Sequence, residues 1–115
     1  MNTRKIGTVK EQQAAKFLEA EGYRILEQNF RCPRGEIDLI ASRDGILVFV
    51  EVKYRAGMGS GAPEEAVNAA KQRRIIRAAT QYLAQEGLWE RTFCRFDVIA
   101  ICGEKFFHYI DAFQS

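Results

Sequence analysis

The sequence predicts a mixed α/β fold in which helices flank a central sheet. Apolar residues recur at helical spacing over residues 8–21 and again in a long segment that begins at Pro63. Between and after these helices lie short runs rich in valine, isoleucine and phenylalanine, bounded by turn residues, which is typical of strands. We therefore expect the order αβββαββ, with a mixed sheet that is antiparallel at its start.

The first predicted helix, residues 8–21, ends where Gly22 supplies a C-terminal stop. Residues 23–30 contain side chains that favour an extended segment, and the sequence Cys-Pro-Arg-Gly at 32–35 is typical of a loop. These segments lead from the first helix into the sheet.

The dipeptide Asp44-Gly45 is the clearest turn signal in the chain, because it favours a two-residue β-hairpin loop. With these residues as the loop, Arg43 pairs with Ile46, and the remaining pairs follow outward from there. One face of the hairpin is then entirely apolar, and its burial fixes the register. That face comprises Ile37, Leu39, Ala41, Val48, Val50 and Val52.

The opposite face of this hairpin carries charges inside otherwise apolar strands. In the predicted register Asp38 lies opposite Glu51, and Glu36 lies opposite Lys53. The half of this face nearer the turn is apolar, so we expect both sides of the sheet to be covered. Facing carboxylates repel, and a hard divalent cation such as Mg²⁺ or Mn²⁺ would remove that conflict. Alternatively, Glu36 pairs with Lys53 and the face is simply polar.

The second half of the chain continues the alternation of helix and strand. A glycine-rich loop is predicted after residue 55, and Pro63 then opens a long helix that Gly87 closes. Strands are predicted over residues 96–101 and 105–110.

The composition limits the class of protein. At 115 residues the chain is expected to form one domain, residues 1–115, and no segment approaches the roughly 20 apolar residues of a membrane span. The N-terminus has basic residues but no apolar signal segment, so we expect a cytoplasmic protein without a membrane partner. Cys32, Cys94 and Cys102 are odd in number and widely spaced, which favours reduced thiols over a disulfide or zinc framework. The single histidine, His108, is expected to be structural.

The charged residues of the hairpin resemble a known signature. Asp38 followed by Glu51-Val52-Lys53 resembles the PD-(D/E)XK nuclease motif, although Ile37 occupies the position of its proline. The element order resembles that superfamily's restriction-endonuclease-like αβββαβ core. Residues 10–31 and the segments GEIDLI (35–40), VFVEVKYR (48–55) and RFDVIAI (95–101) extend the resemblance. Through them, nearly the whole chain is similar to the bacterial YraN family, which is described as Holliday-junction-resolvase-like. The resemblance implies an endonuclease that uses Mg²⁺ or Mn²⁺ on DNA, with Asp38 and Glu51 as metal ligands and Lys53 assisting the nucleophile.

Three further residues enter the predicted site with alternatives open. Glu11 matches a glutamate that the first helix of resolvase-like relatives contributes, but Thr8 and Glu11 also have the spacing of a capping box. Glu36 is a second candidate to complete the ligand set. Lys71 continues the apolar stripe of the long helix, so its ammonium group lies either at the edge of the site or on an ordinary surface. The stripe comprises Lys71, Ile75, Ala78 and Tyr82.

The net charge of +2 neither demands nor excludes a nucleic-acid partner, so the prediction of such a partner depends on how the charges are distributed. Basic residues concentrate in the middle of the chain, where they favour contacts with a phosphate backbone. The candidates are Arg55, Lys71, Arg73, Arg74 and Arg77. The resemblance also implies a homodimer.

Two other classes of function remain open. The chain could be a non-catalytic nucleic-acid-binding module with a nuclease-like fold, or a structural protein whose hairpin charges pair among themselves. Asp97 is a separate case: a carboxylate inside an apolar strand is expected to pair with an arginine such as Arg95, in a structural role.

Overall fold

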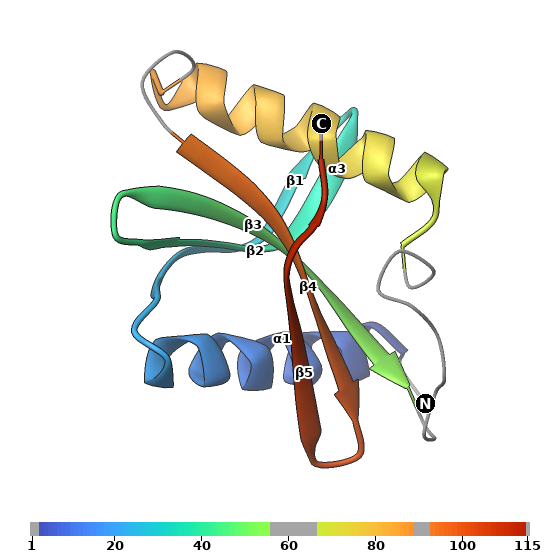
Figure 1. Cartoon of the computed structure of the whole chain (residues 1–115). Helices are drawn as coiled ribbons and strands as arrows, with labels where there is room; N and C mark the ends of the chain where they lie inside the picture. The colour runs from blue at the N-terminus through green and yellow to red at the C-terminus, as the bar shows by residue number, and fades with distance from the viewer. Residues whose placement is uncertain (1–2, 56–66, 89–92, 115) are drawn as a thin grey trace.

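A computed structural model describes residues 3–55, 67–88 and 93–114, with the backbone alone at residues 3–8 and 55. The predicted glycine-rich loop and Pro63 lie outside these ranges. The elements are α1 (Thr3–Ala20), β1 (Arg24–Cys32), β2 (Gly35–Arg43), β3 (Ile46–Arg55), α3 (Ala69–Gln85), β4 (Phe93–Cys102) and β5 (Lys105–Phe113), shown in Figure 1.

The predicted mixed α/β fold is confirmed, and it is compatible with a restriction-endonuclease-like core. The strands lie in the order β1-β2-β3-β4-β5. Strands β3 and β4 are parallel, whereas the other neighbours are antiparallel. Because parallel neighbours need a crossover connection, α3 lies between β3 and β4 in the chain and covers one face of the sheet.

The predicted starts of both helices are wrong. Helix α1 begins at Thr3, earlier than the predicted start at residue 8. Helix α3 begins at Ala69 and not at Pro63, because Asn68 caps it: the Asn68 side-chain oxygen accepts a hydrogen bond from the Lys71 backbone N–H at 2.8 Å.

Neither helix among the described residues has the length and apolar character required to cross a membrane.

The predicted ends of the helices are confirmed. Gly22 and Gly87 have φ values of 95° and 68°, in the left-handed region that glycine adopts without strain. After α1, the Tyr23 N–H donates to the Leu18 carbonyl at 3.0 Å, which closes the last turn.

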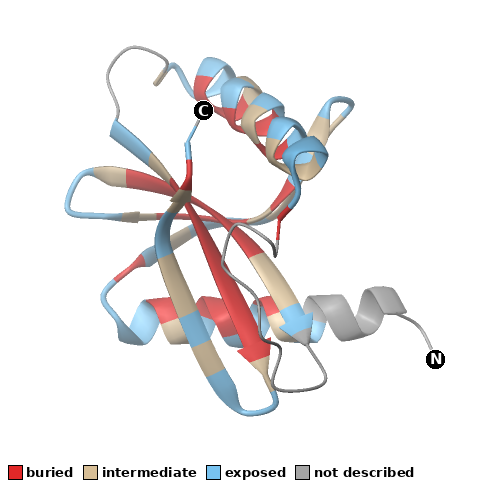
Figure 2. Ribbon diagram, turned by 45° about the vertical axis from the view of Figure 1, so that its right-hand side comes forward, coloured by how far each residue is buried: buried red, intermediate tan, exposed pale blue. Residues whose placement is uncertain are grey.

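Buried side chains form one cluster on each face of the sheet, so the prediction that both faces are covered is confirmed. Figure 2 shows buried positions along the central strands and on the sides of the helices that face them. The cluster beneath α3 includes Ile37, Ile40, Leu47, Phe49, Ile75, Tyr82 and Phe96. The cluster against α1 includes Ala14, Leu18, Leu39, Ala41, Val48, Val50 and Ile99.

The register of the β2–β3 hairpin is confirmed next to its turn. The paired residues run from Arg43 and Ile46 to Leu39 and Val50, as Asp44-Gly45 predicts. The ladder then ends, because the two strands diverge. Two predicted pairs are therefore absent from it: Asp38 with Glu51, and Glu36 with Lys53.

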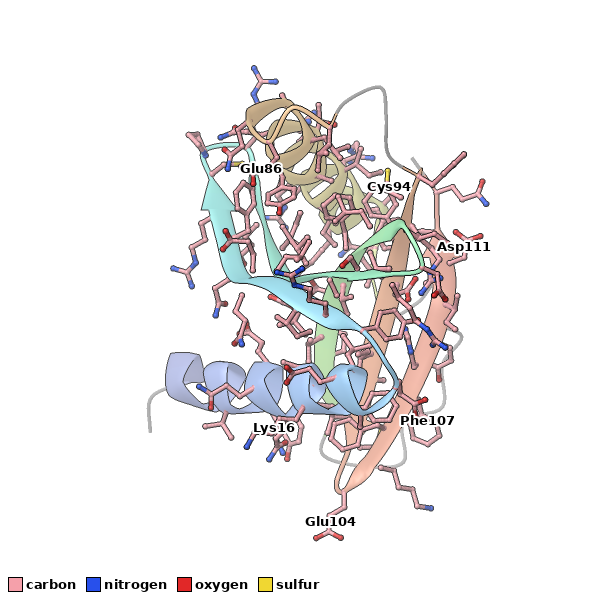
Figure 3. All side chains as sticks on the ribbon, turned by 90° about the vertical axis from the view of Figure 1, so that its left-hand side faces the viewer. Lys16, Glu86, Cys94, Glu104, Phe107 and Asp111 are labelled. Atoms are coloured by element: carbon pink, nitrogen blue, oxygen red, sulfur yellow. The ribbon has the colours of Figure 1, made fainter. Side chains whose placement is uncertain are left out.

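The divergence also overturns one assignment of faces. Ile37 and Leu39 were predicted to share a face, but Ile37 packs beneath α3 and Leu39 packs against α1. The change of face falls between these two residues, and the turn end of the β1–β2 hairpin lies close to α3 (Figures 1 and 3). The hairpin meets the helix closely, since a Cβ atom on Gly35 would lie 2.2 Å from the Arg74 carbonyl oxygen.

Candidate functional site in the fork between β2 and β3

The fork is the point where β2 and β3 separate, and it places Asp38 beside Glu51. The Asp38 Oδ2 atom accepts a hydrogen bond from the Val52 backbone N–H at 2.8 Å. A side chain thus takes the place of a main-chain partner, which explains why the ladder ends there. Burial and the neighbouring Glu51 carboxylate raise the pKa of Asp38 from 3.8 to about 7. The two acids therefore conflict electrostatically, as the sequence predicts.

Two lysines offset the charge of Glu51, which is only 3% exposed. The Lys71 Nζ atom lies 2.8 Å from Glu51 Oε1, and the Lys53 Nζ atom lies 4.0 Å from the same oxygen. Burial lowers the pKa of Lys71, but the hydrogen bond and charge of Glu51 outweigh it and raise that pKa overall. Of the two alternatives for Lys71, the structure shows the one in which its ammonium group reaches the site.

Helix α1 brings a third carboxyl group to the fork. Glu11 is 8% exposed, and burial together with the charges of Asp38 and Glu36 raises its pKa from 4.5 to about 7. With its amide nitrogen turned toward Glu11, Asn29 donates to both carboxyl oxygens, at 2.6 and 3.1 Å. The capping-box alternative is wrong, because α1 begins at Thr3 and Glu11 lies well inside the helix.

These groups surround a cavity of about 230 Å³, which we call the fork cavity. It collects side chains from both helices and from both strands of the fork. Its lining comprises Lys10, Glu11, Asp38, Glu51, Val52, Lys53, Tyr54 and Lys71. Five predicted site residues are therefore brought together: Glu11, Asp38, Glu51, Lys53 and Lys71.

Glu36 does not line the fork cavity. Its side chain is exposed and lies 3.5 Å from the Arg31 guanidinium of β1. The alternative in which Glu36 pairs with Lys53 is likewise wrong, since the strands have already separated at that point. Glu36 instead borders a neighbouring pocket beneath α3.

The fork suits a hard divalent cation by the chemistry of its donors. Asp38 and Glu51 offer carboxylate oxygens, which Mg²⁺ and Mn²⁺ prefer. Within the described ranges no group of three or more histidine, cysteine or acidic side chains is arranged to hold an ion. A pair of carboxylates is enough for Mg²⁺, because this ion commonly keeps several waters and binds through one or two carboxylates plus substrate phosphate oxygens. In this structure the Lys71 ammonium group forms an ion pair with Glu51 Oε1, an oxygen that a metal ion would bind.

The predicted basic residues are divided between two settings. Lys71 and Arg74 line cavities, whereas Arg73 and Arg77 are exposed on α3 and line no cavity described. The side chain of Arg55 lies outside the described residues. Sequence reasoning missed Arg31, Arg34 and Lys10. Only the fold brings these three near the fork. Arg34, in the loop predicted at 32–35, could have been identified from the sequence as a candidate for binding phosphate.

Asp97 forms a separate buried network on β4. Arg95 donates to its two oxygens at 2.8 and 2.9 Å, and the Asp111 N–H donates at 2.9 Å. The His108 Nε2 atom lies 2.7 Å from the same carboxylate. Burial raises the pKa of Asp97, but the hydrogen bonds from His108 and Arg95 outweigh it and hold that pKa below its ordinary value. The predicted pairing with Arg95 is confirmed. Both carboxylate oxygens are buried and have partners within the protein, which fits the expected structural role.

Comparison with known proteins identifies relatives over most of the chain. The family model described as "Uncharacterised protein family UPF0102" matches residues 10–101. The chain is 50% identical over 105 residues to a UPF0102 protein of Lachnoclostridium phytofermentans, covering 91% of this chain and 89% of that protein. It is 56% identical over 99 residues to a UPF0102 protein of Symbiobacterium thermophilum, covering 86% and 83% respectively.

A UPF0102 protein of Clostridium perfringens is 51% identical over 96 residues, which cover 84% of this chain and 78% of that protein. The matched segment contains α1 from Lys10 onward, the fork and α3. The predicted membership of the YraN family, which rests on similarity over nearly the whole chain, is therefore confirmed, and the chain belongs to the UPF0102 family.

Proposed function

We propose that this protein is a metal-dependent endonuclease that hydrolyses phosphodiester bonds in DNA, including branched or junction DNA. The observation that carries the proposal is the pair Asp38 and Glu51, held together in a half-buried fork with lysines on its border. A fold gains nothing in stability from two buried acids that repel each other, and perturbed pKa values of this kind gather at functional sites.

In the proposed reaction, a water oxygen attacks the phosphorus, the bond to the leaving sugar oxygen breaks, and that oxygen takes a proton from solvent water. Asp38 and Glu51 would hold Mg²⁺ or Mn²⁺, which when bound would neutralise the two acids and polarise the phosphate. Lys53, at the border of the cavity, donates hydrogen bonds to the attacking water and stabilises negative charge on the phosphate. Glu11 lines the same cavity, so its carboxylate can accept the water's proton.

Cleavage of labelled DNA tests this function. The substrates are linear duplex, single-stranded, flap and four-way-junction DNA, each with Mg²⁺ or Mn²⁺ at low salt. We expect wild type and Asp44→Asn to cleave at least one substrate, because Asp44 is exposed in the hairpin turn at φ 52°, a conformation that asparagine accepts. Asp38→Asn should lose cleavage. Equal cleavage by Asp38→Asn and wild type would contradict the proposal.

A non-catalytic nucleic-acid-binding module is the second candidate. The observation in its favour is the 2.8 Å ion pair between Lys71 and Glu51, which neutralises the fork without an ion. Under this alternative, wild type and Asp38→Asn bind DNA equally in a salt-dependent way, and neither cleaves it. The cleavage panel, run together with a binding titration, separates the two candidates.

Replacing Lys71 tests whether it competes with an ion. Lys71→Met removes the partner of a buried carboxylate, so we expect a lower melting temperature without metal. The same change frees Glu51, so Mn²⁺ should raise the melting temperature more in the variant than in wild type. Lys16→Met is the control, since Lys16 is exposed on the outer side of α1 (Figure 3). An equal rise in melting temperature with Mn²⁺ in Lys71→Met and wild type would show that Lys71 does not compete with the ion for Glu51.

A further inference from the structure

A second pocket lies beside the fork cavity, between the turn of the β1–β2 hairpin and the first turns of α3. Its volume is about 320 Å³, and we call it the hairpin pocket. It is lined by Arg31, Cys32, Pro33, Arg34, Gly35, Glu36, Lys71, Arg74 and Ile75. Four of these side chains are cationic and one is acidic.

Part of this charge is already matched within the protein. Arg31 lies 3.5 Å from Glu36, and Lys71 lies 2.8 Å from Glu51. Arg34 and Arg74 form no ion pair with any residue in the described ranges, and both are exposed to solvent and line the pocket. The hairpin pocket therefore has an unmatched positive charge that comes from two different elements.

The two elements are held in a close and fixed relation. Gly35 packs against the backbone of Arg74 so tightly that a Cβ atom would overlap the Arg74 carbonyl. The start of α3 is fixed in turn by the Asn68 cap. Arg34 and Arg74 are therefore carried on backbones that do not need to move to face one ligand, which lowers the entropic cost of binding.

The hairpin pocket adjoins the fork cavity through a shared wall. Lys71 lines both spaces, with its ammonium group on Glu51 at the fork. A strand whose phosphate reacts at the fork would therefore place a neighbouring phosphate over the hairpin pocket. Arginine suits that contact, because its guanidinium group can donate two parallel hydrogen bonds to phosphate oxygens.

We propose that Arg34 and Arg74 form a binding subsite for a DNA backbone phosphate adjacent to the one that reacts. This inference rests on the proposed action on DNA. The subsite directs the bound strand from the fork toward the turn of the β1–β2 hairpin. It contacts the backbone alone, so it contributes affinity and strand position without base specificity.

Binding of a fluorescent DNA duplex without divalent ions tests the subsite independently of cleavage. We expect Arg34→Gln and Arg74→Gln each to reduce the slope of log affinity against log salt, and the double variant to reduce it by about 1, the loss of one phosphate contact. Arg34→Lys should keep most of that slope. Arg24→Gln is the matched control: Arg24 is exposed at the other end of β1, and its loss should leave the slope unchanged. Circular dichroism confirms that each variant is folded.

A single uncharged methylphosphonate, moved along one strand, locates the contact. At one position it should weaken binding by wild type but cause no further loss in the Arg34→Gln/Arg74→Gln double variant. Equal losses in both proteins at every position, or salt slopes unchanged by the arginine variants, would overturn the subsite. Stabilisation by inorganic phosphate without any effect of the arginines on DNA binding would overturn it in favour of a free-phosphate site. If wild type fails to cleave but the slopes fall as expected, the nuclease proposal fails and the subsite stands.

Discussion

Asp38→Asn is expected to stabilise the metal-free protein at neutral pH while it removes cleavage. The folded protein holds the Asp38 proton up to about pH 7, whereas the unfolded chain releases it near the ordinary value of 3.8. Between these values the folded state binds more protons, so the stability contributed by this group falls as pH rises and stays low above pH 7. Asparagine does not titrate, so the variant does not lose this stability as pH rises. Its side-chain oxygen can still accept a hydrogen bond from the Val52 N–H.

The size of this effect can be measured by urea unfolding at several pH values. We expect the free energy of unfolding of Asp38→Asn to exceed that of wild type by on the order of 1–3 kcal/mol above pH 7. The difference should shrink toward pH 4, where the Asp38 carboxyl is protonated in the folded protein. Cleavage should fall by at least about 100-fold. Asp44→Asn is the control, and a destabilised Asp38→Asn at pH 8 would contradict the account.

Asp97→Asn is expected to cause the largest loss of stability of any change considered. The Asp97 carboxylate is fully buried and accepts hydrogen bonds from Arg95 and the Asp111 N–H. Removing its charge leaves the Arg95 guanidinium without its partner, and breaking a buried pair in this way costs about 3–5 kcal/mol. That is a large fraction of the stability of a typical domain, which is about 5–15 kcal/mol.

The matched control for this change is Asp111→Asn. Asp111 lies on the exposed edge strand β5 (Figure 3), and it contributes its backbone N–H to Asp97, a donor that asparagine keeps. Its φ of 56° also suits asparagine. We expect Asp111→Asn to unfold at the same urea concentration as wild type, while Asp97→Asn unfolds much earlier. Because the pKa of Asp97 is lowered, its contribution should be present at neutral pH and lost as pH falls below the ordinary carboxyl range. Matching unfolding curves for the two variants would contradict the structural role of Asp97.

Local sequence signals account for much of the fold. Asp44-Gly45 predicted the hairpin register next to the turn, because loop length and turn type determine which residues face each other. Gly22 and Gly87 predicted where helices end, since both occupy the left-handed region. The Arg95–Asp97 pair was predictable because residues two apart on a strand point to the same side.

Long-range geometry explains what the sequence did not predict. The period-two pattern assumes a regular strand, so it put Ile37 on the same face as Leu39, whereas the two pack on opposite faces of the sheet. The turn of the β1–β2 hairpin lies against α3, so Arg34 lines one pocket with Arg74, although the two residues are far apart in the chain. The start of α3 was misplaced because Pro63 is a common helix opener, whereas Asn68 provides the actual cap.

The most direct test of the central claim is the position of Mn²⁺ in crystals of the wild-type protein, located by anomalous diffraction. The account predicts an ion about 2.0–2.3 Å from carboxylate oxygens of Asp38 and Glu51, with the Lys71 ammonium displaced from the Glu51 oxygen. The contrary result is a fork without an anomalous peak at saturating Mn²⁺, in which Lys71 Nζ still lies 2.8 Å from Glu51. That result would show that a lysine, and not a metal ion, permanently neutralises these carboxylates.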